Sequence, residues 1–330
     1  MKRSRKSTRR SYRQMLLAAM SRFLPTRVFR PFGFRPDARW TPRFLVYAVI
    51  LMAWGSAKTL ADRYDEARQT VVRIFPSRRR PGRSYQGFIG ALLRWSVRLL
   101  VGVTAHLREA ICQIAEDHWR REGFIAFAPD GTRVECPRTE GNEKALGCGG
   151  RKGSGPQFWL TTLWRMGTGL PWAWRIGPAK DAERTHVREM LWLLPRFALL
   201  VADAGFTGYE LFWDVLASGR SLLIRLGSNV RLLRELGYAE VEKDGTVYLW
   251  PQRFQKKYRP PLLLRLIVLE RKGKKIYLVT NLSDSELPIE RAARLHEMRW
   301  GVEMSQSYYV LCNGFYHVVS LGLGLVKMAA

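Results

Sequence analysis

Residues Leu199–Phe206 read LLVADAGF, and the interpretation of the whole chain starts from this stretch. An apolar run ends on Asp203 and turns at Gly205, and the next residues, TGYELFWDVLAS, have helical spacing. The pattern predicts a buried parallel strand that carries one carboxylate to its C-terminal end and then turns into a helix. Open α/β sheets hold their ligands at that end of their strands. A simpler interpretation stays open, because Asp often caps the helix that follows it.

The composition is that of a basic globular protein. The 330 residues are 47% hydrophobic, include 12 Trp and carry a net charge of +27, which is enough chain for two or three domains. The charge favours a polyanionic partner, nucleic acid before an anionic membrane. The four cysteines are far apart without a CxxC pair, which argues against a zinc site or disulfide framework and fits a reducing cytosol. No secretory signal is evident, and the apolar run 44–54 is shorter than the ~20 residues of a membrane span.

The N-terminal third is expected to form a basic arm and a helical domain. Residues 1–36 contain eleven Lys or Arg and no acidic residue, which predicts a flexible arm that lies along phosphates; a solvated tail without a role is the alternative. Residues 41–75 and 85–121 have helical spacing and are joined by the basic loop 76–84, PSRRRPGRS. Over 37–122 this suits a DNA-binding helical domain, and equally any small helical bundle.

Residues 123–227 are expected to form an α/β core. Short apolar or alternating runs predict strands at 124–128 and 132–137, on either side of Asp130. A further strand and its continuation are predicted in FWLTTLWRM and LPWAWRIGP, and a helix over 181–194 with Asp181 as its N-cap. The strand that ends at Asp203, its helix and a strand at 221–227 complete the pattern.

The resulting order, β-β-β-α-β-α-β, is that of an RNase H-like mixed sheet flanked by helices. In that topology the first and fourth strands are neighbours. Asp130 and Asp203 are 73 positions apart in the chain (203 − 130). We therefore expect the two carboxylates at the ends of adjacent strands.

The remaining residues predict three further segments. Residues 228–274 combine short strand patterns with basic loops, which predicts a β-rich insertion. Residues 275–305 supply the last core strand and a helix that Pro288 opens. Residues 306–330 contain one charged residue, Lys327, and a hydrophobic core segment or a membrane segment would explain this apolar tail imperfectly.

The last predicted helix carries Glu303 one turn after Arg299. If this helix packs beside the first and fourth strands, Glu303 joins Asp130 and Asp203, and the three carboxylates hold two divalent ions, Mg²⁺ or Mn²⁺. Two such ions ~4 Å apart clamp the attacking and leaving oxygens of a phosphoryl displacement. Arg299 lies on the same helix face and would hold a phosphate bidentately. The alternative for Glu303 is an ordinary surface position.

The chain resembles the insertion-sequence transposases with a D-D-E catalytic core, in the bacterial group called the IS-four family. The similar stretches are APDGTRVECPRT around Asp130, RKGSGPQFWLTTLW at 151–164, LVADAGFTGYELF around Asp203, LVTNL at 278–282, and MRWGVEM around Glu303. The resemblance implies an RNase H-like fold with a β-rich insertion before the last catalytic residue. It also implies metal-dependent cutting of DNA at transposon ends, followed by strand transfer.

The family signature on the last helix is Tyr, two residues, Arg, three residues, Glu, six residues, Lys. Arg299 and Glu303 match it, His296 stands at the Tyr position, and Val310 stands at the Lys position. The resemblance ends where the charge falls, and we expect that a frameshift or truncation after about residue 305 replaced the native C-terminus.

These observations predict a transposase that acts on double-stranded DNA as a homodimer in a synaptic complex. We expect no small-molecule cofactor, no membrane association, and a cytoplasmic, nucleoid-associated location. The predicted phosphate or DNA contacts are Arg299, His296, Arg151 and Lys152. Two alternatives stay open: a DNA-binding remnant without catalysis, and a basic membrane-associated protein anchored by residues 306–326.

Overall fold

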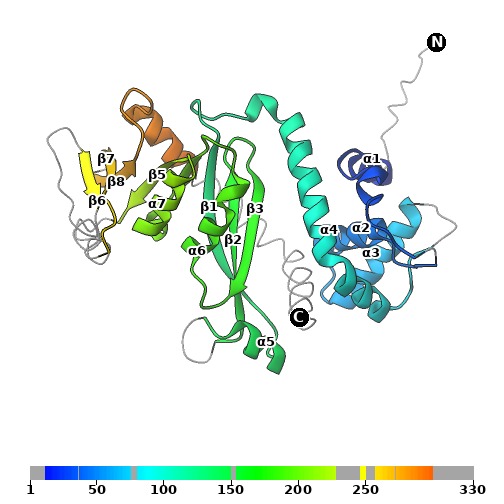
Figure 1. Ribbon diagram of the computed structural model, residues 1–330. Helices are drawn as coiled ribbons and strands as arrows, with labels where there is room; N and C mark the ends of the chain where they lie inside the picture. The colour runs from blue at the N-terminus through cyan, green and yellow to red at the C-terminus, as the bar shows by residue number, and fades with distance from the viewer. Residues whose placement is uncertain are drawn as a thin grey trace, which may run out of the picture. The chain divides into compact units, whose positions relative to one another are not determined.

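A computed structural model describes most of the chain (Figure 1). The described residues are 12–35, 37–75, 80–149, 154–227, 257–271 and 273–299, with the backbone of 246–249. They divide into two compact units, the first ending at Ile114 and the second beginning at Ala115. Four residues named above, together with the apolar tail 306–330, lie outside this part of the chain: Arg151, Lys152, Glu303 and Val310.

The first unit is helical, as the spacing of its apolar residues predicts. Thr41 and Thr59 cap the two central helices by accepting hydrogen bonds from the backbone N–H groups of Phe44 and Asp62. Pro42 occupies the first turn of the first of these helices, where a missing N–H costs nothing. The elements are α1 (Tyr12–Phe23), η1 (Thr26–Phe29), α2 (Pro42–Trp54), α3 (Leu60–Ile74) and α4 (Tyr85–Ile114).

The predicted flexible arm is wrong from residue 12 onward. Leu16 and Met20 of α1, Leu24, and Phe29 of η1 are buried in the core of the helical unit. The basic residues of this segment therefore lie between apolar residues that pack inward, and the burial of those residues holds the segment against the unit.

Helix α4 is long and apolar enough, by length and composition, to cross a membrane, and core helices of soluble proteins meet the same criterion. Its residues Phe88, Ala91, Leu92 and Leu99 are buried in the core of the helical unit. Val101, in contrast, is 68% exposed. One side of α4 thus completes the core.

The second unit is built on one sheet of eight strands, in the order β3-β2-β1-β4-β5-β8-β7-β6. Strands β1, β4 and β5 are parallel to one another, and the other pairs are antiparallel. This arrangement confirms the predicted RNase H-like mixed sheet, including the neighbouring first and fourth strands. The strands are β1 (Ala126–Glu135), β2 (Gln157–Arg165), β3 (Leu170–Pro178), β4 (Leu199–Ala202), β5 (Ser221–Leu226), β6 (Thr246–Leu249), β7 (Leu262–Arg271) and β8 (Lys274–Thr280).

Helices α6 and α7 contact each other and pack beside the sheet, α6 against β3 and α7 against β5 (Figure 1). Helix α7 follows β4, as the opening stretch predicts. The helical elements are η2 (Glu116–His118), α5 (Glu140–Leu146), α6 (Glu183–Met190), η3 (Leu191–Leu193), η4 (Ala204–Phe206) and α7 (Tyr209–Ala217).

Two details of the strands predicted before Asp181 are wrong. Residues 124–128 and 132–137 do not form two strands, because β1 runs straight through Pro129-Asp130-Gly131. The missing N–H of Pro129 is tolerated there, since the pairing with β4 ends at Phe127. The two halves of the next predicted strand instead form the β2–β3 hairpin, which turns at Gly169 with φ of 65°.

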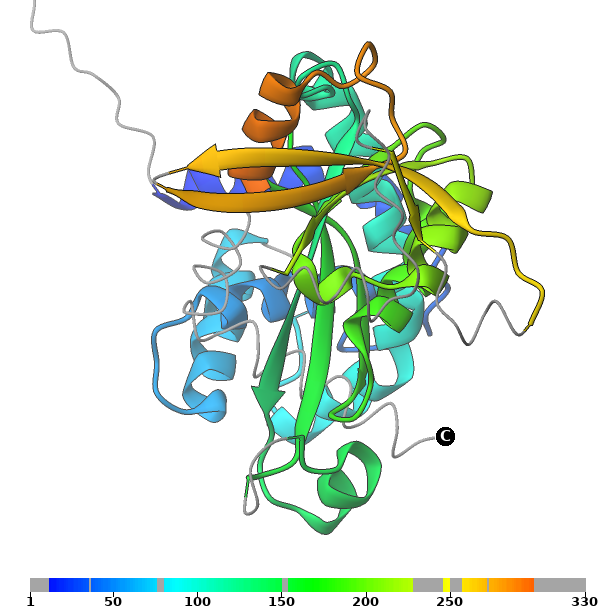
Figure 2. The same cartoon turned by 90° about the vertical axis from the view of Figure 1, so that its left-hand side faces the viewer.

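Toward the β6 end of the sheet, strands β7 and β8 form a long antiparallel hairpin, which faces the viewer in Figure 2. Strands β6 and β7 come from the predicted insertion 228–274 and extend the main sheet. Residues 289–299 are helical. In this helix Ala292 and Leu295 are buried against Leu278 of β8 and Ile267 of β7, so the helix that precedes Glu303 is anchored on the sheet.

Candidate active site

Strand register brings Asp130 and Asp203 to the same level of the sheet. The parallel strands β1 and β4 pair Ala126 with Leu199 and Phe127 with Leu200. Both pairs are 73 positions apart in the chain, and so are Asp130 and Asp203. Asp203 follows the last residue of β4 directly, whereas β1 continues past Asp130. The two carboxylates therefore stand on neighbouring strands where the parallel pairing ends.

Each aspartate is oriented by a backbone N–H group. The Gly131 N–H donates to Asp130 Oδ1, and the Gly205 N–H donates to Asp203 Oδ1, both at 2.9 Å. Asp203 is the N-cap of η4, so the capping alternative is realised for this short 3₁₀ turn and not for α7.

A third carboxylate, Glu183 at the start of α6, belongs to the same site and was not predicted. A Cβ atom built on Gly131 would lie 2.7 Å from the Glu183 carboxyl carbon, so the Glu183 side chain lies close against Gly131, next to Asp130, and would have to shift if residue 131 carried a Cβ. Burial, followed by the charges of Asp130 and Asp203, raises the pKa of Glu183 to about 7, against the opposing effect of Arg133 and Arg184. We call Asp130, Asp203 and Glu183 the acidic edge.

Helix α6 is fixed by contacts on both sides, which holds Glu183 in place. The buried His186 ring has Nδ1 2.8 Å from the Thr161 hydroxyl of β2 and Nε2 3.2 Å from Asp181 Oδ2. Arg188 donates to Asp214 and Glu210 of α7. The predicted N-cap was wrong, because Ala182 occupies that position and the Asp181 side chain is turned to His186.

His296 and Arg299 lie on the helix formed by 289–299, and both are buried, with 3% and 2% of their surface exposed. Burial, and then the charges of Arg299, Arg225 and Arg271, lower the pKa of His296 to about 4. His296 is therefore neutral at physiological pH. Its Nε2 atom has no hydrogen-bond partner among the described residues.

The acidic edge has the donor chemistry of a divalent-cation site. Carboxylate oxygens are the ligands that Mg²⁺ and Mn²⁺ prefer. Among the described residues, no group of three or more His, Cys, Asp or Glu side chains is placed to hold a metal ion. The predicted third ligand, Glu303, lies outside those residues. The acidic edge therefore offers oxygen donors of the right kind, without a grouped set of three ligands in the described part of the chain.

Comparison with known proteins identifies the family of the chain. A family model described as a transposase DDE domain matches residues 123–307, more than half of the chain. No curated protein matches significantly.

Among solved structures, the chain is similar to the piggyBac transposase in a synaptic complex with hairpin DNA, at 11% identity over 95% of this chain and 72% of that one, with a TM-score of 0.41. It is also similar to the Mos1 transposase in a paired-end complex with the left transposon end, at 12% identity over 58% and 60% of the two chains, with a TM-score of 0.22. On the strength of the family model, the chain belongs to the transposases with a DDE domain.

Proposed function

We propose that this protein is a transposase that cuts DNA at transposon ends and joins the freed 3′ end to target DNA, with Mg²⁺ or Mn²⁺ held by Asp130, Asp203 and Glu303. The observation that carries the proposal is the parallel register of β1 and β4, which, continued past Phe127 and Leu200, sets Asp130 level with Asp203 just after β4. Family membership supplies the reaction class, and the RNase H-like sheet supplies the frame. As in the resemblance noted for the sequence, we assign the chain to the bacterial insertion-sequence type.

The acidic edge would contribute preorganised carboxylates. Two bound divalent ions would activate the attacking oxygen and stabilise the leaving oxygen of the displacement. Asp130 and Asp203 present oxygens that the Gly131 and Gly205 N–H groups have already oriented, so little reorganisation is needed when the ions bind. Glu183, with its pKa of about 7, is partly protonated near neutral pH.

The predicted phosphate contacts are retained with different roles. Arg299 and His296 are buried, so we propose that Arg299 acts on a DNA phosphate mainly through its positive potential at the helix that leads to Glu303. The neutral His296 fills the space beside it without adding charge. Arg151 and Lys152, which lie outside the described residues, are proposed as direct DNA contacts.

The partner is proposed to be double-stranded DNA at transposon ends and target sites. The net charge of +27 favours a polyanion of this kind. The similar piggyBac and Mos1 structures are a synaptic complex and a paired-end complex. We propose a homodimer that pairs two transposon ends, with no small-molecule cofactor, located with the nucleoid in the cytoplasm.

The proposal is tested with a labelled duplex that carries the inverted repeats flanking the gene. Purified protein with Mg²⁺ should cut the duplex at the repeat boundary and leave a 3′-hydroxyl, and EDTA should stop the cutting. Cutting that is unchanged in Asp130→Asn and Asp203→Asn would refute the assignment. Binding without any cutting by the unaltered protein would favour the alternative, a DNA-binding remnant that no longer catalyses.

A further inference from the structure

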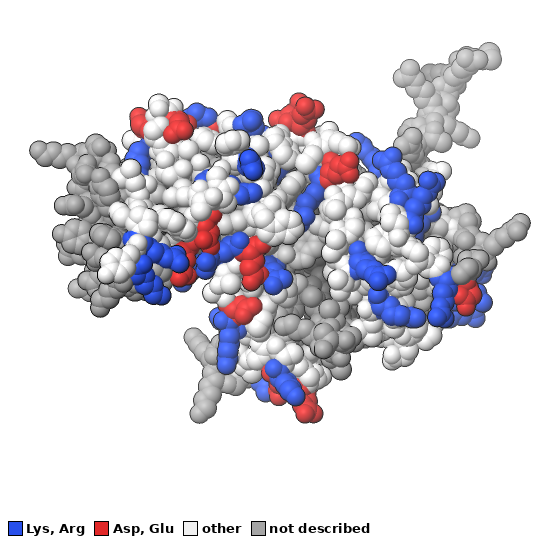
Figure 3. All heavy atoms as spheres, in the orientation of Figure 1, with Lys and Arg blue, Asp and Glu red and all other residues white. Residues whose placement is uncertain are grey.

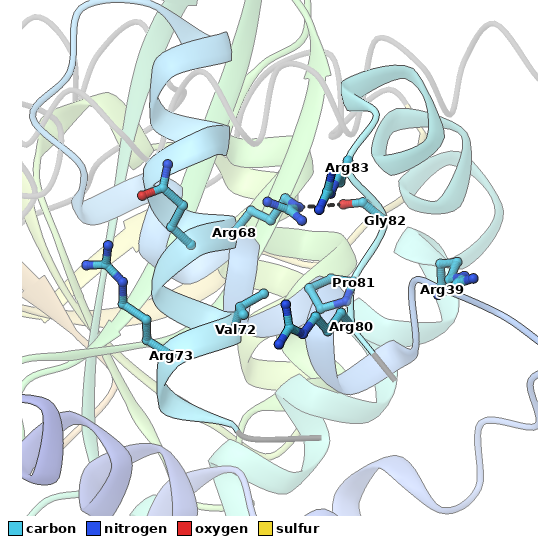
Figure 4. Close-up of a pocket in the computed structure, with 9 residues that line it drawn as sticks. Arg39, Arg68, Val72, Arg73, Arg80, Pro81, Gly82 and Arg83 are labelled. Carbon is cyan, nitrogen blue, oxygen red and sulfur yellow. Dashed lines mark hydrogen bonds between the residues drawn. The ribbon is translucent and has the colours of Figure 1, made fainter. Parts of the chain in front are cut away.

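The helical unit contains a hollow of about 640 Å³ that is lined mainly by arginine (Figure 4). Two of the arginines come from α3, one precedes α2, and two lie in the segment that leads into α4. No Asp or Glu is among the lining residues. We call this the arginine hollow, and its arginines are Arg39, Arg68, Arg73, Arg80 and Arg83.

The backbone of the hollow is held in place by contacts with the core of the helical unit. The Gly82 carbonyl oxygen accepts hydrogen bonds from Arg68 Nε at 2.8 Å and from the Tyr64 hydroxyl at 3.1 Å. A Cβ atom on Gly82 would lie 2.9 Å from Nε1 of the buried Trp40, so the segment approaches the core more closely than other residues allow. The backbone between Arg80 and Arg83 is thereby anchored on α3.

The charges in the hollow are not neutralised within the described part of the chain. None of the five arginines takes part in an ion pair found there, and Arg39, Arg73, Arg80 and Arg83 are exposed. The nearest carboxylates along α3, Asp65 and Glu66, do not line the hollow. Guanidinium groups keep their protons at all physiological pH values, so five of them around one hollow repel one another unless an anion lies between them.

We propose that the arginine hollow binds consecutive phosphates of a DNA strand. Guanidinium groups match phosphate oxygens with paired hydrogen bonds. Lys and Arg also gather over the helical unit on the face in Figure 3, which extends the positive surface that a polyanion follows. The inference rests on the proposed function for the choice of DNA, and it assigns DNA anchoring to a unit that does not contain the acidic edge.

The test compares two double variants of the full chain in DNA-binding titrations at several salt concentrations. Arg73→Gln with Arg80→Gln removes two charges from the hollow. Arg94→Gln with Arg98→Gln removes two exposed charges from α4 that do not line it. The hollow variant should weaken binding roughly tenfold or more on any duplex sequence, and lower the slope of log K against log salt by about 1.8, or 0.9 per lost contact.

The control variant should change that slope by less than about 0.5, since its arginines contact no phosphate. Equal losses in the two variants would show that only net charge matters and would overturn the proposal, as would an unchanged slope. Charge-retaining Arg73→Lys with Arg80→Lys should keep the slope but bind more weakly. Anionic vesicles serve as a further arm: a loss of vesicle binding in the hollow variant, with DNA binding intact, also overturns it.

Cleavage of the repeat-bearing duplex separates this inference from the proposed function. If the unaltered protein cuts DNA and the two double variants bind alike, the hollow assignment fails while the transposase assignment stands. If DNA binding depends on Arg73 and Arg80 but no cutting occurs with Mg²⁺, the catalytic assignment fails while the hollow assignment stands.

Discussion

The acidic edge of the sheet and the arginine hollow of the helical unit both gather like charges, but they relieve the repulsion by different means. At the acidic edge one member titrates, because the pKa of Glu183 rises to about 7 and a proton reduces the charge. Arginine cannot do this, so the hollow keeps its positive charge, and four of its five arginines are exposed. The first site is therefore suited to exchange a proton for a metal cation, and the second is suited to retain an anion.

The largest effect is expected at the acidic edge. Asp203→Asn should lower the rate of DNA cutting at least about 10³-fold, because it removes several kcal/mol of metal-mediated stabilisation of the transition state. Asp284→Asn, at a carboxylate whose side chain is 76% exposed, is the matched control and should keep the rate. The rate is measured with protein in excess over labelled duplex.

Asp203→Asn and the hollow variant, Arg73→Gln with Arg80→Gln, together test whether the acidic edge and the arginine hollow have separate roles. Asp203→Asn should leave the salt slope of DNA binding unchanged, whereas the hollow variant should cut normally once DNA is saturated. A weaker DNA affinity in Asp203→Asn, matching that of the hollow variant, would mean that the two regions do not have separate roles.

His296 provides a second case of a titratable group among like charges, this time among arginines. Its folded pKa of about 4 lies below the ordinary 6.5, so the unfolded chain binds the extra proton, and stability present above pH 6.5 is lost as the pH falls toward 4. Between about pH 7 and pH 5 the loss is about 2 kcal/mol. Urea unfolding of the native chain and of His296→Gln should show this loss only in the native chain.

His118→Gln, at an exposed histidine, is the control for that experiment and should retain the loss of stability. If His296→Gln loses as much stability between these pH values as the native chain, His296 is not held neutral by its surroundings. His296 would then not be a second titratable group, beside Glu183, whose pKa is shifted by burial and neighbouring like charges.

Metal binding should stabilise the sheet unit. With Mg²⁺ at about ten times its dissociation constant, the free energy of unfolding rises by about 1.4 kcal/mol, which is about 3–6 °C in Tm for a unit of this size. Asp130→Asn should abolish the increase, and Asp284→Asn should preserve it. An equal increase in all three proteins would indicate general salt stabilisation and no site at the acidic edge.

The sequence was sufficient for the features that follow from strand order. Apolar runs and their spacing predict β1 and β4 as neighbours, and the parallel register then sets Asp130 level with Asp203. The stretch Leu199–Phe206 was also informative about its local turn, since Asp203 directly follows a buried strand and caps η4.

Features that depend on side chains meeting across the fold were not predictable in this way. Glu183 was missed because helix α6 starts at Glu183, after Ala182 as its cap, and because its contact with Gly131 joins residues 52 positions apart (183 − 131). Gly131 beside Asp130 was the available signal. The arginine hollow was likewise visible only as the basic loop 76–84, because Trp40, Tyr64 and Arg68 determine where Gly82 lies.

The smallest predicted effect tests whether Glu183 belongs to the acidic edge. Its pKa is raised above the ordinary 4.5 to about 7, so the folded chain binds the proton more tightly, and the stability that this proton contributes is lost as the pH rises from 4.5 to 7. Glu183→Gln removes that loss. The variant should gain about 1 kcal/mol over the native chain at about pH 8, after allowance for solvent screening, and little at about pH 5.

Mg²⁺ should reverse the sign of this difference, because a bound cation favours the ionised Glu183, whereas the neutral amide of the variant carries no charge for the cation to attract. Thermal melts of the native chain and of Glu183→Gln at the two pH values, with and without Mg²⁺, give all four comparisons. Glu189→Gln, on the exposed side of the same helix, serves as the control. A gain that is independent of pH would reflect helix propensity alone, and Glu183 would then be a neighbour of the aspartates without electrostatic coupling to them.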